Sequence, residues 1–196
     1  MPQVKLVGIP GSLRAASFSR ATLIGLCSVL PDTVAMEICD LRLPLYNEDD
    51  DRSDAPEVVS KFRDAIASSD GVVIVTPEYN HGIPGVLKNA LDWASRPFGK
   101  SVLTNKPALA ISISPAFTGG VRAHAQLNET LLAIPALVLG GPQVVIADIG
   151  NKIEDGVLVD QPSLSFALTA LERMVGRGGA GRCGLSLEQR LDERSG

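Results

Sequence analysis

The chain contains 196 residues, of which 45% are hydrophobic and 20% charged, and its formal net charge is -4. This length and composition predict a soluble globular protein with one core. The negative charge argues against nucleic acid or an anionic membrane as a partner, and no apolar run reaches the length of a transmembrane helix.

The cysteines and histidines limit the chemistry further. Cys27, Cys39 and Cys183 are odd in number and scattered, and the chain opens without the pattern of a signal peptide. Both features predict a reducing, cytoplasmic location. His81 and His124 are the only histidines and there is no Cys-x-x-Cys pair, so we expect no metal site.

The first apolar run, Val4–Ile9, predicts a buried strand that leads into a turn. Small and hydroxylated residues follow in the stretch Gly11–Ser19. Apolar residues then recur at helical spacing over Ala21–Leu30 and stop at a proline. We therefore expect a strand, a short loop and a helix whose N-cap is Ser17 or Ser19.

This first loop has the composition of an anion site. Amides at the start of a helix lack partners within the helix, and the helix dipole favours negative charge there. The loop adds three serine hydroxyls and Arg14. A serine-rich cap beside a solvated arginine is the alternative, and the local composition does not decide between them. The loop matches neither the G-x-G-x-x-G fingerprint nor the P-loop.

The second predicted strand is Val34–Ile38, and a polar loop follows at Asp40–Asp54. Four acidic residues gather in that loop at 48–51, and we expect them to be solvated because their spacing does not fit a calcium loop. Apolar residues on one face of Pro56–Ser68 predict the next helix.

The stretch Gly71–Trp93 combines the strongest strand signal with an unusual loop. The β-branched run Val72–Val75 predicts a strand that is buried on both faces, as in a parallel sheet. Helical spacing resumes at Val86–Trp93. An ordinary turn between strand and helix needs only proline and glycine, whereas this one adds acid, aromatic, amide and imidazole groups, so we favour a ligand site. The residues are Pro77, Glu78, Tyr79, Asn80 and His81.

The fourth apolar run, Pro107–Ile113, predicts a strand that opens into another loop of small residues, Ser114–Gly120. A long helical stretch follows at Val121–Leu139, bent or broken by Pro135. The remaining predictions are a fifth strand at Gln143–Ala147, a turn or short hairpin at Asn151–Asp160, a last helix at Pro162–Val175 and a flexible tail at 177–196.

Five strands that alternate with helices predict an α/β fold, with a doubly wound parallel sheet between two layers of helices. In the flavodoxin-like strand order 2-1-3-4-5, strands one, three and four are neighbours, so the loops after them meet at one edge. Open α/β sheets bind ligands at that edge. The convergence favours the phosphate interpretation of the first loop, and we expect one domain at 1–176.

These loops resemble those of the NAD(P)H-dependent FMN reductase family, which includes bacterial chromate and quinone reductases. The stretches 11–19, 77–80 and 83–93 carry the resemblance, and the similar layout covers residues 4–175. It implies FMN as the cofactor, NAD(P)H as the reductant with NADPH favoured, and a small-molecule electron acceptor. It also implies that Ser12, Arg14, Ser17, Phe18 and Ser19 hold the FMN phosphate, that Pro77, Glu78, Tyr79 and Asn80 line the ring and ribityl chain, and that Ser114, Gly119 and Gly120 close the other side.

A few positions depart from the family pattern. Ala16 stands where close relatives often have glycine and Ser19 where they often have asparagine, although backbone amides still serve the phosphate. His81 and Gly82 stand where some relatives have tyrosine and serine, near the ring, so this departure affects substrate choice. His81 is either a proton donor to the product or a surface histidine beside the site.

The resemblance implies an oxidoreductase that passes hydride from NAD(P)H through FMN to a quinone, an azo compound, chromate or free flavin. The alternatives are a flavodoxin-like electron carrier and a redox-sensing flavin-binding module, and turnover of NADPH with a quinone separates the enzyme from both. A low-molecular-weight phosphatase is excluded because the first loop contains no cysteine nucleophile.

Family members are commonly dimers or tetramers, so the resemblance also implies a homodimer or homotetramer. The helix expected at Val86–Trp93 points the same way, because we expect that one face cannot bury Leu87, Leu91 and Trp93 against the sheet. The remaining apolar residues would then form a two-fold interface beside the flavin.

Overall fold

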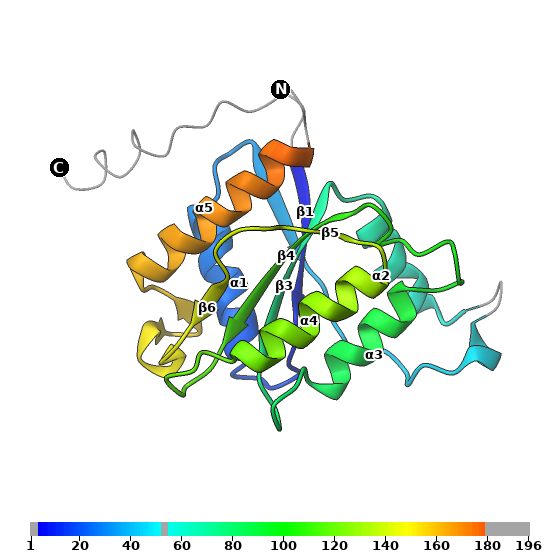
Figure 1. Ribbon diagram of the computed structural model, residues 1–196, viewed down its shortest axis with the longest axis horizontal. Coiled ribbons are helices and arrows are strands. Elements are labelled where there is room, and N and C mark those ends of the chain that lie inside the picture. The colour runs from blue at the N-terminus through cyan, green and yellow to red at the C-terminus, as the bar shows by residue number, and fades with distance from the viewer. Residues whose placement is uncertain (1–3, 52–54, 179–196) are drawn as a thin grey trace.

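The centre of the computed structural model, which describes residues 4–51 and 55–178, is a parallel sheet (Figure 1). Its main strands are β1 (Val4–Pro10), β2 (Val34–Ile38), β3 (Gly71–Pro77) and β4 (Pro107–Ile113). Strand β1 lies between β2 and β3, and β4 lies on the far side of β3. This arrangement confirms the predicted flavodoxin-like order.

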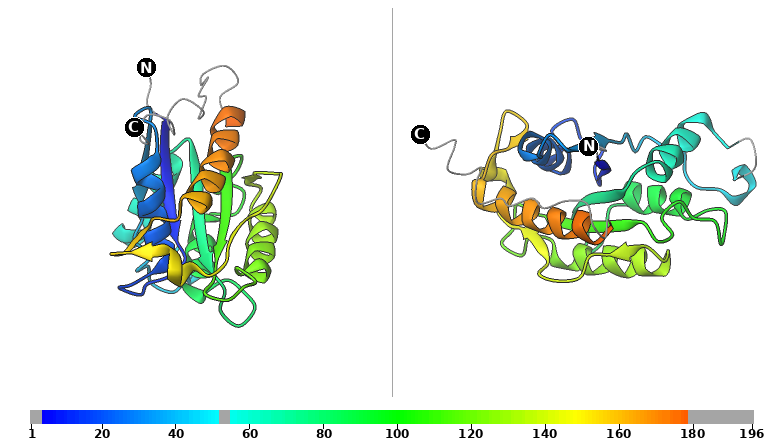
Figure 2. Two further views of the ribbon diagram at one scale, coloured as in Figure 1. Left: turned by 90° about the vertical axis from the view of Figure 1, so that its left-hand side faces the viewer. Right: turned by 90° about the horizontal axis from the view of Figure 1, so that it is seen from above.

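Helices cover both faces of the sheet and complete three layers (Figures 1 and 2). They are α1 (Phe18–Val29), α2 (Glu57–Ala67), α3 (Gly85–Ala94), α4 (Val121–Ala133) and α5 (Gln161–Gly178). Val73 and Val75 of β3 point toward α1 and α5, whereas Val72 and Ile74 point toward the other three helices. All four side chains are fully buried, which explains the unbroken apolar run of β3.

The far edge of the sheet differs from the prediction. Two short strands, β5 (Leu137–Val138) and β6 (Val144–Ile146), pair one after the other with β4. The fifth strand is therefore confirmed as β6, but the prediction of helix as far as Leu139 is wrong, because α4 ends at Ala133. Pro135 lacks the amide hydrogen that a continuing helix needs, and the chain after it joins the sheet.

Short elements complete the described ranges. The antiparallel pair of β7 (Ile153–Glu154) and β8 (Val157–Leu158) confirms the predicted hairpin, and η1 (Glu48–Asp50) and η2 (Ile149–Lys152) are 3-10 helices. Helix α5 continues to residue 178, past its predicted end at Val175, so residues 177 and 178 are helical and not part of a tail. The rest of the predicted tail lies outside the described residues. Among the helices of the described ranges, none has the length and apolar character needed to cross a membrane.

The acidic loop before α2 is anchored, so the expectation that all of its carboxylates are solvated is wrong. The Asp51 carboxylate lies 2.7 Å from the Arg63 guanidinium, and the Asp51 side chain is only 6% exposed. Arg63 also donates to the backbone oxygen of Trp93 at 2.9 Å. Because a buried carboxylate needs such a partner, this ion pair ties the loop to α2 and α3.

Helix α3 buries its apolar side chains within the single chain. Leu87, Leu91 and Trp93 are fully buried, and the indole nitrogen of Trp93 donates to the Pro44 carbonyl oxygen at 2.8 Å. The expectation that the sheet leaves these three residues over for an interface is therefore wrong, because the loop before α2 packs on the helix as well.

Helix α4 starts without a capping side chain of its own. Gly119 and Gly120 precede it with φ of 61° and 82°, a left-handed conformation that glycine adopts without strain. Oε2 of Glu78, from the loop after β3, accepts the backbone amides of Arg122 and Ala123 at 3.0 and 3.2 Å. A carboxylate there satisfies free amides and is attracted by the helix dipole, so it fixes two loops to each other.

Replacing Glu78 with alanine removes this cap, and we expect the free energy of unfolding to fall by about 1–2 kcal/mol in urea denaturation. Glu78→Gln keeps an oxygen acceptor without the charge and should lose less. The matched control is Glu129→Ala, an exposed glutamate of the same helix, which should change the free energy of unfolding by less than about 0.5 kcal/mol. Equal losses in the two alanine variants would contradict the capping role.

Candidate cofactor and substrate site

Three loops meet at the carboxyl edge of the sheet, at the bottom of Figure 1. They follow β1, β3 and β4, whose pairing aligns Pro10 with Val75 and Pro77 with Ile113. The first loop packs so closely on β3 that a Cβ on Gly11 would lie 3.1 Å from the Val75 oxygen, an approach that favours glycine. The structure thus brings together the three loops that sequence analysis selected.

In the loop after β1, side chains organise the start of α1. Ser17 is the N-cap, because its Oγ accepts the Arg20 amide at 3.2 Å. Ser12 Oγ accepts the Arg14 amide at 3.4 Å, and the Arg14 guanidinium lies over the Phe18 ring, 5.4 Å from its centre. This stacking orients an exposed arginine without using its N–H donors, which leaves them for an anion.

Ser19 provides a test of whether this loop suits a phosphate. Its side chain is fully buried in the first turn of α1, and its Oγ has no hydrogen-bond partner within the described ranges. An unpaired buried hydroxyl costs roughly 1–3 kcal/mol. The amides of Phe18 and Ser19 likewise have no carbonyl oxygen within the helix to bond. The hydroxyl, the amides and Arg14 therefore fit an anionic group such as the phosphate of FMN.

The loop after β3 is a tight hairpin. Tyr79 and Gly82 exchange two backbone hydrogen bonds of 3.0 Å, and the residues between them have positive φ, 51° at Asn80 and 66° at His81. Two left-handed residues are the mark of a type I′ turn, and each costs a residue other than glycine roughly 1 kcal/mol. The Tyr79, Asn80 and His81 side chains are all exposed, so a strained, exposed turn stands at the expected ligand edge.

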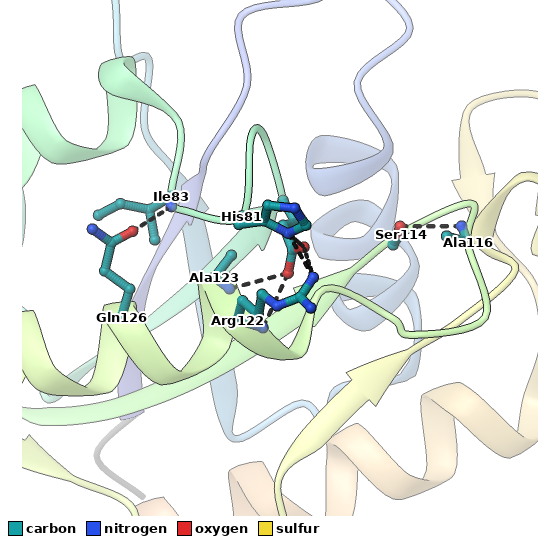
Figure 3. Close-up of polar contacts among 8 residues, drawn as sticks. His81, Ile83, Ser114, Ala116, Arg122, Ala123 and Gln126 are labelled. Carbon is teal, nitrogen blue, oxygen red and sulfur yellow. Dashed lines mark hydrogen bonds and ion pairs between the residues drawn. The ribbon is translucent and has the colours of Figure 1, made fainter.

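Helix α4 holds this hairpin from one side. Oε1 of Gln126 accepts the Ile83 amide at 2.7 Å, and Figure 3 shows the two residues facing each other. The same oxygen would lie 2.6 Å from a Cβ on Gly82. Glycine at this position therefore leaves room for the Gln126 side chain, and a second contact joins the hairpin to α4.

Beside the hairpin, Arg122 and His81 form an exposed polar pair (Figure 3). Arg122 Nη1 lies 2.6 Å from His81 Nδ1 and 4.0 Å from Glu78 Oε1, and His81 Nδ1 lies 3.5 Å from the same oxygen. The Glu78 carboxylate is thus engaged by α4 and mostly buried. Sequence analysis did not select Arg122, although an arginine two residues after the glycine pair that precedes α4 is a signal that could have identified it.

The loop after β4 is shaped mainly by its backbone. Ser114 Oγ accepts the Ala116 amide at 3.1 Å (Figure 3), so this hydroxyl is engaged within the loop. A Cβ on Gly119 would overlap the Val145 side chain of β6, which explains the glycine. Phe117, by contrast, is 92% exposed. Ser114 and Gly119 therefore set the path of a loop that presents one aromatic ring.

The three loops and the first turns of their helices carry excess positive charge. Residues 11–20, 77–84 and 114–122 contain three arginines and one glutamate, in a chain whose net charge is -4. Within residues 4–51 and 55–178, no group of three or more His, Cys, Asp or Glu side chains is placed to hold a metal ion. The electrostatics of the site favour an anionic ligand.

Comparisons with known proteins agree with this arrangement. Residues 4–150 match the NADPH-dependent FMN reductase family. A 2-hydroxy-1,4-benzoquinone reductase of a Burkholderia species is 37% identical over 172 residues, 87% of this chain and 93% of that protein. An NAD(P)H-dependent FMN reductase of Pseudomonas aeruginosa is 36% identical over 173 residues, 87% of this chain and 93% of that protein.

A solved structure extends the similarity to three dimensions. The flavoenzyme FerB of Paracoccus denitrificans, an NAD(P)H:(acceptor) oxidoreductase, has a TM-score of 0.77 and 32% identity, with 88% of this chain and 95% of that chain covered. The family match includes β1, β3, β4 and the three loops that follow them. The chain therefore belongs to the NADPH-dependent FMN reductase family, as a flavodoxin-like oxidoreductase that uses FMN and a reduced nicotinamide.

Proposed function

We propose that this oxidoreductase reduces small quinones with NAD(P)H, in the crevice between the loops after β1, β3 and β4. The observation that carries the proposal is a phosphate-type cradle after β1 next to a strained, exposed hairpin after the neighbouring strand. A relative at 37% identity is a benzoquinone reductase, which supports this acceptor class. FMN, when bound, would take a hydride from NAD(P)H and pass reducing equivalents to the quinone. The chain itself binds and orients the two substrates.

Each loop has its own part in this proposal. The loop after β1 holds the FMN phosphate, because the buried Ser19 hydroxyl, the first amides of α1 and the stacked Arg14 all offer donors. The hairpin lines the ring and ribityl chain with its backbone and exposed side chains, while the Glu78 carboxylate keeps α4 in place. The residues in these roles are Ser12, Arg14, Ser17, Phe18 and Ser19 for the phosphate, Pro77, Glu78, Tyr79 and Asn80 for the ring, and Ser114, Gly119 and Gly120 on the other side.

NADPH is the reductant that we favour over NADH. Its additional phosphate brings negative charge toward a site whose loops carry surplus arginines. Azo compounds, chromate and free flavin are further acceptors of the proposed range, because an exposed edge with aromatic and polar side chains excludes none of them by size.

We also propose that the protein works in the cytoplasm. Cys27 and Cys39 are both free thiols, as expected in a reducing compartment. Burial raises the pKa of Cys39 to about 12, so this thiol stays protonated and unreactive near neutral pH.

Arg14→Ala tests the phosphate assignment. Loss of one charge-assisted contact, worth about 1.5–3 kcal/mol, should raise the Kd for FMN roughly 10- to 100-fold. The Kd for riboflavin, which has no phosphate, should stay nearly constant, and fluorescence quenching measures both. Lys61→Ala, which removes an exposed positive charge on α2, is the control and should leave both values unchanged. An equal loss for FMN and riboflavin would remove the assignment.

The use of one crevice by reductant and acceptor in turn predicts ping-pong kinetics. Initial rates with NADPH and a quinone, without any partner protein, should give parallel lines in double-reciprocal plots. Intersecting lines would show a ternary complex and reject the single shared site. The absence of turnover would favour an electron carrier or a sensing module instead.

We propose that the protein forms a homodimer. Two such dimers would form a homotetramer if a second interface is present. Because Leu87, Leu91 and Trp93 of α3 are buried within the chain, the support comes from elsewhere. Tyr79 and Phe117 of the loops and Val121 at the start of α4 are exposed apolar residues at the carboxyl edge of the sheet. Gly120 lies against Glu78, which joins the loops after β3 and β4. A two-fold contact over these exposed side chains would cover apolar surface on both subunits.

Light scattering at micromolar concentration should therefore give the mass of a dimer or tetramer for the wild type and a smaller mass for Phe117→Asp. Phe98→Asp is the matched control, because Phe98 is equally exposed but lies in the connection between α3 and β4, at the opposite edge of the sheet. A monomeric wild type would reject the assembly, and a Phe117→Asp variant with the wild-type mass would place the interface elsewhere.

A further inference from the structure

The contact between Arg122 and His81 determines which nitrogen of the histidine carries a proton. Arg122 Nη1 lies 2.6 Å from His81 Nδ1. A guanidinium group has only hydrogen-bond donors, so Nδ1 must accept the hydrogen bond with its lone pair. A neutral imidazole carries one proton, and that proton is then on Nε2.

Both members of the pair are held in place from behind. The Arg122 amide donates to Glu78 Oε2 at 3.0 Å, and its guanidinium lies 4.0 Å from Glu78 Oε1. His81 is fixed by the type I′ turn at the tip of the hairpin. A proton on Nδ1 would face the guanidinium at short range, and Glu78 Oε1, at 3.5 Å, is too distant for a good hydrogen bond. The surroundings thus select the Nε2–H tautomer.

We propose that Arg122 is a positioning residue that keeps His81 as this tautomer, and that His81 Nε2–H donates a hydrogen bond to an oxygen of the electron acceptor. The proposal rests on the proposed function, because it needs a quinone at the carboxyl edge of β3. The His81 side chain is 71% exposed there, so it is accessible to a substrate.

The chemical benefit arises as the quinone is reduced. Negative charge develops on a quinone oxygen when the ring takes up a hydride, and a fixed N–H donor stabilises that charge. His81 keeps its proton, and the proton that completes the hydroquinone comes from solvent. The overall balance is NADPH, quinone and one proton giving NADP⁺ and hydroquinone. The Nε2–H group of His81 acts on the quinone, so the half-reaction with NADPH should not depend on it.

Nitrogen NMR of the full-length, ¹⁵N-labelled protein tests the tautomer without any turnover. The chain has only two histidines, His81 and His124, so the spectrum of His81→Gln assigns both rings. His124 is a useful internal reference, because it is buried and burial lowers its pKa. We expect the ring nitrogens of His81 to show the Nε2–H pattern in the wild type and a mixture of tautomers in Arg122→Leu. Arg122→Lys, which keeps a donor, should restore part of the wild-type pattern.

A wild-type spectrum with Nδ1–H, or an Arg122→Leu spectrum identical to the wild type, would overturn the positioning role. If Arg122→Leu unfolds, Arg122→Gln provides the same comparison, because its shorter side chain should not reach the ring. The signals of His124 report on folding in every variant.

Paired substitutions of His81 test the donor role. The amide nitrogen of His81→Gln can take the place of Nε2, whereas that of His81→Asn lies near the position of Nδ1. We expect kcat/KM for the quinone to fall about tenfold in His81→Asn, which has no donor at Nε2, and less than threefold in His81→Gln. The loss in Arg122→Leu should be smaller than in His81→Asn, because part of the His81 population still carries the Nε2–H proton. In His81→Asn, kcat/KM for NADPH should fall less than kcat/KM for the quinone, because the donor acts on the quinone.

Equal losses in the asparagine and glutamine variants, or equal losses for quinone and NADPH, would overturn the donor role in an active enzyme. A wild type that oxidises no NADPH with a quinone would instead overturn the proposed function, and the donor role with it. The tautomer measurement distinguishes the two cases, because it reads the Arg122–His81 contact directly.

Discussion

The parallel pairing of β1, β3 and β4 is the constraint on which the rest of the structure depends. Parallel strands need crossover connections, so each helix lies on a face of the sheet and the carboxyl ends all point to one edge. The strands are buried on both faces, and their polar backbone groups are used in the ladder. Polar side chains that must meet a ligand are therefore collected in the loops at that edge, while the apolar core sets the distances between those loops.

The Glu78 carboxylate joins two of the three loops at this edge, those after β3 and β4. It comes from the loop after β3 and ends on the first amides of α4, two of which it binds. Gln126 adds a second connection from α4 to the hairpin. The position of the His81 ring therefore depends on a helix that follows a different strand, and a disturbance of the α4 N-terminus reaches the site through these two contacts.

The site contains the features that cost stability, whereas the support around it contains features that add stability. The left-handed residues Asn80 and His81 and the unpaired Ser19 hydroxyl are unfavourable in the isolated chain. By contrast, Asp51 pairs with Arg63, and the indole of Trp93 donates to the Pro44 carbonyl oxygen. These contacts hold the loop before α2 on helices α2 and α3. Local costs of this kind beside a well-satisfied framework are typical of functional sites.

The sequence by itself determined the strands β1 to β4, the three loops after β1, β3 and β4, and their convergence, because apolar periodicity and the positions of proline and glycine are local signals. Only the tertiary structure decided what the side chains at the edge do. Glu78 meets Arg122 across 44 residues, and Trp93 meets Pro44 across 49, and neither contact leaves a periodic pattern. The same reason explains the division of the edge position between β5 and β6 and the burial of the large apolar side chains of α3. Each depends on a partner that is distant along the chain and comes into contact only when the sheet has formed.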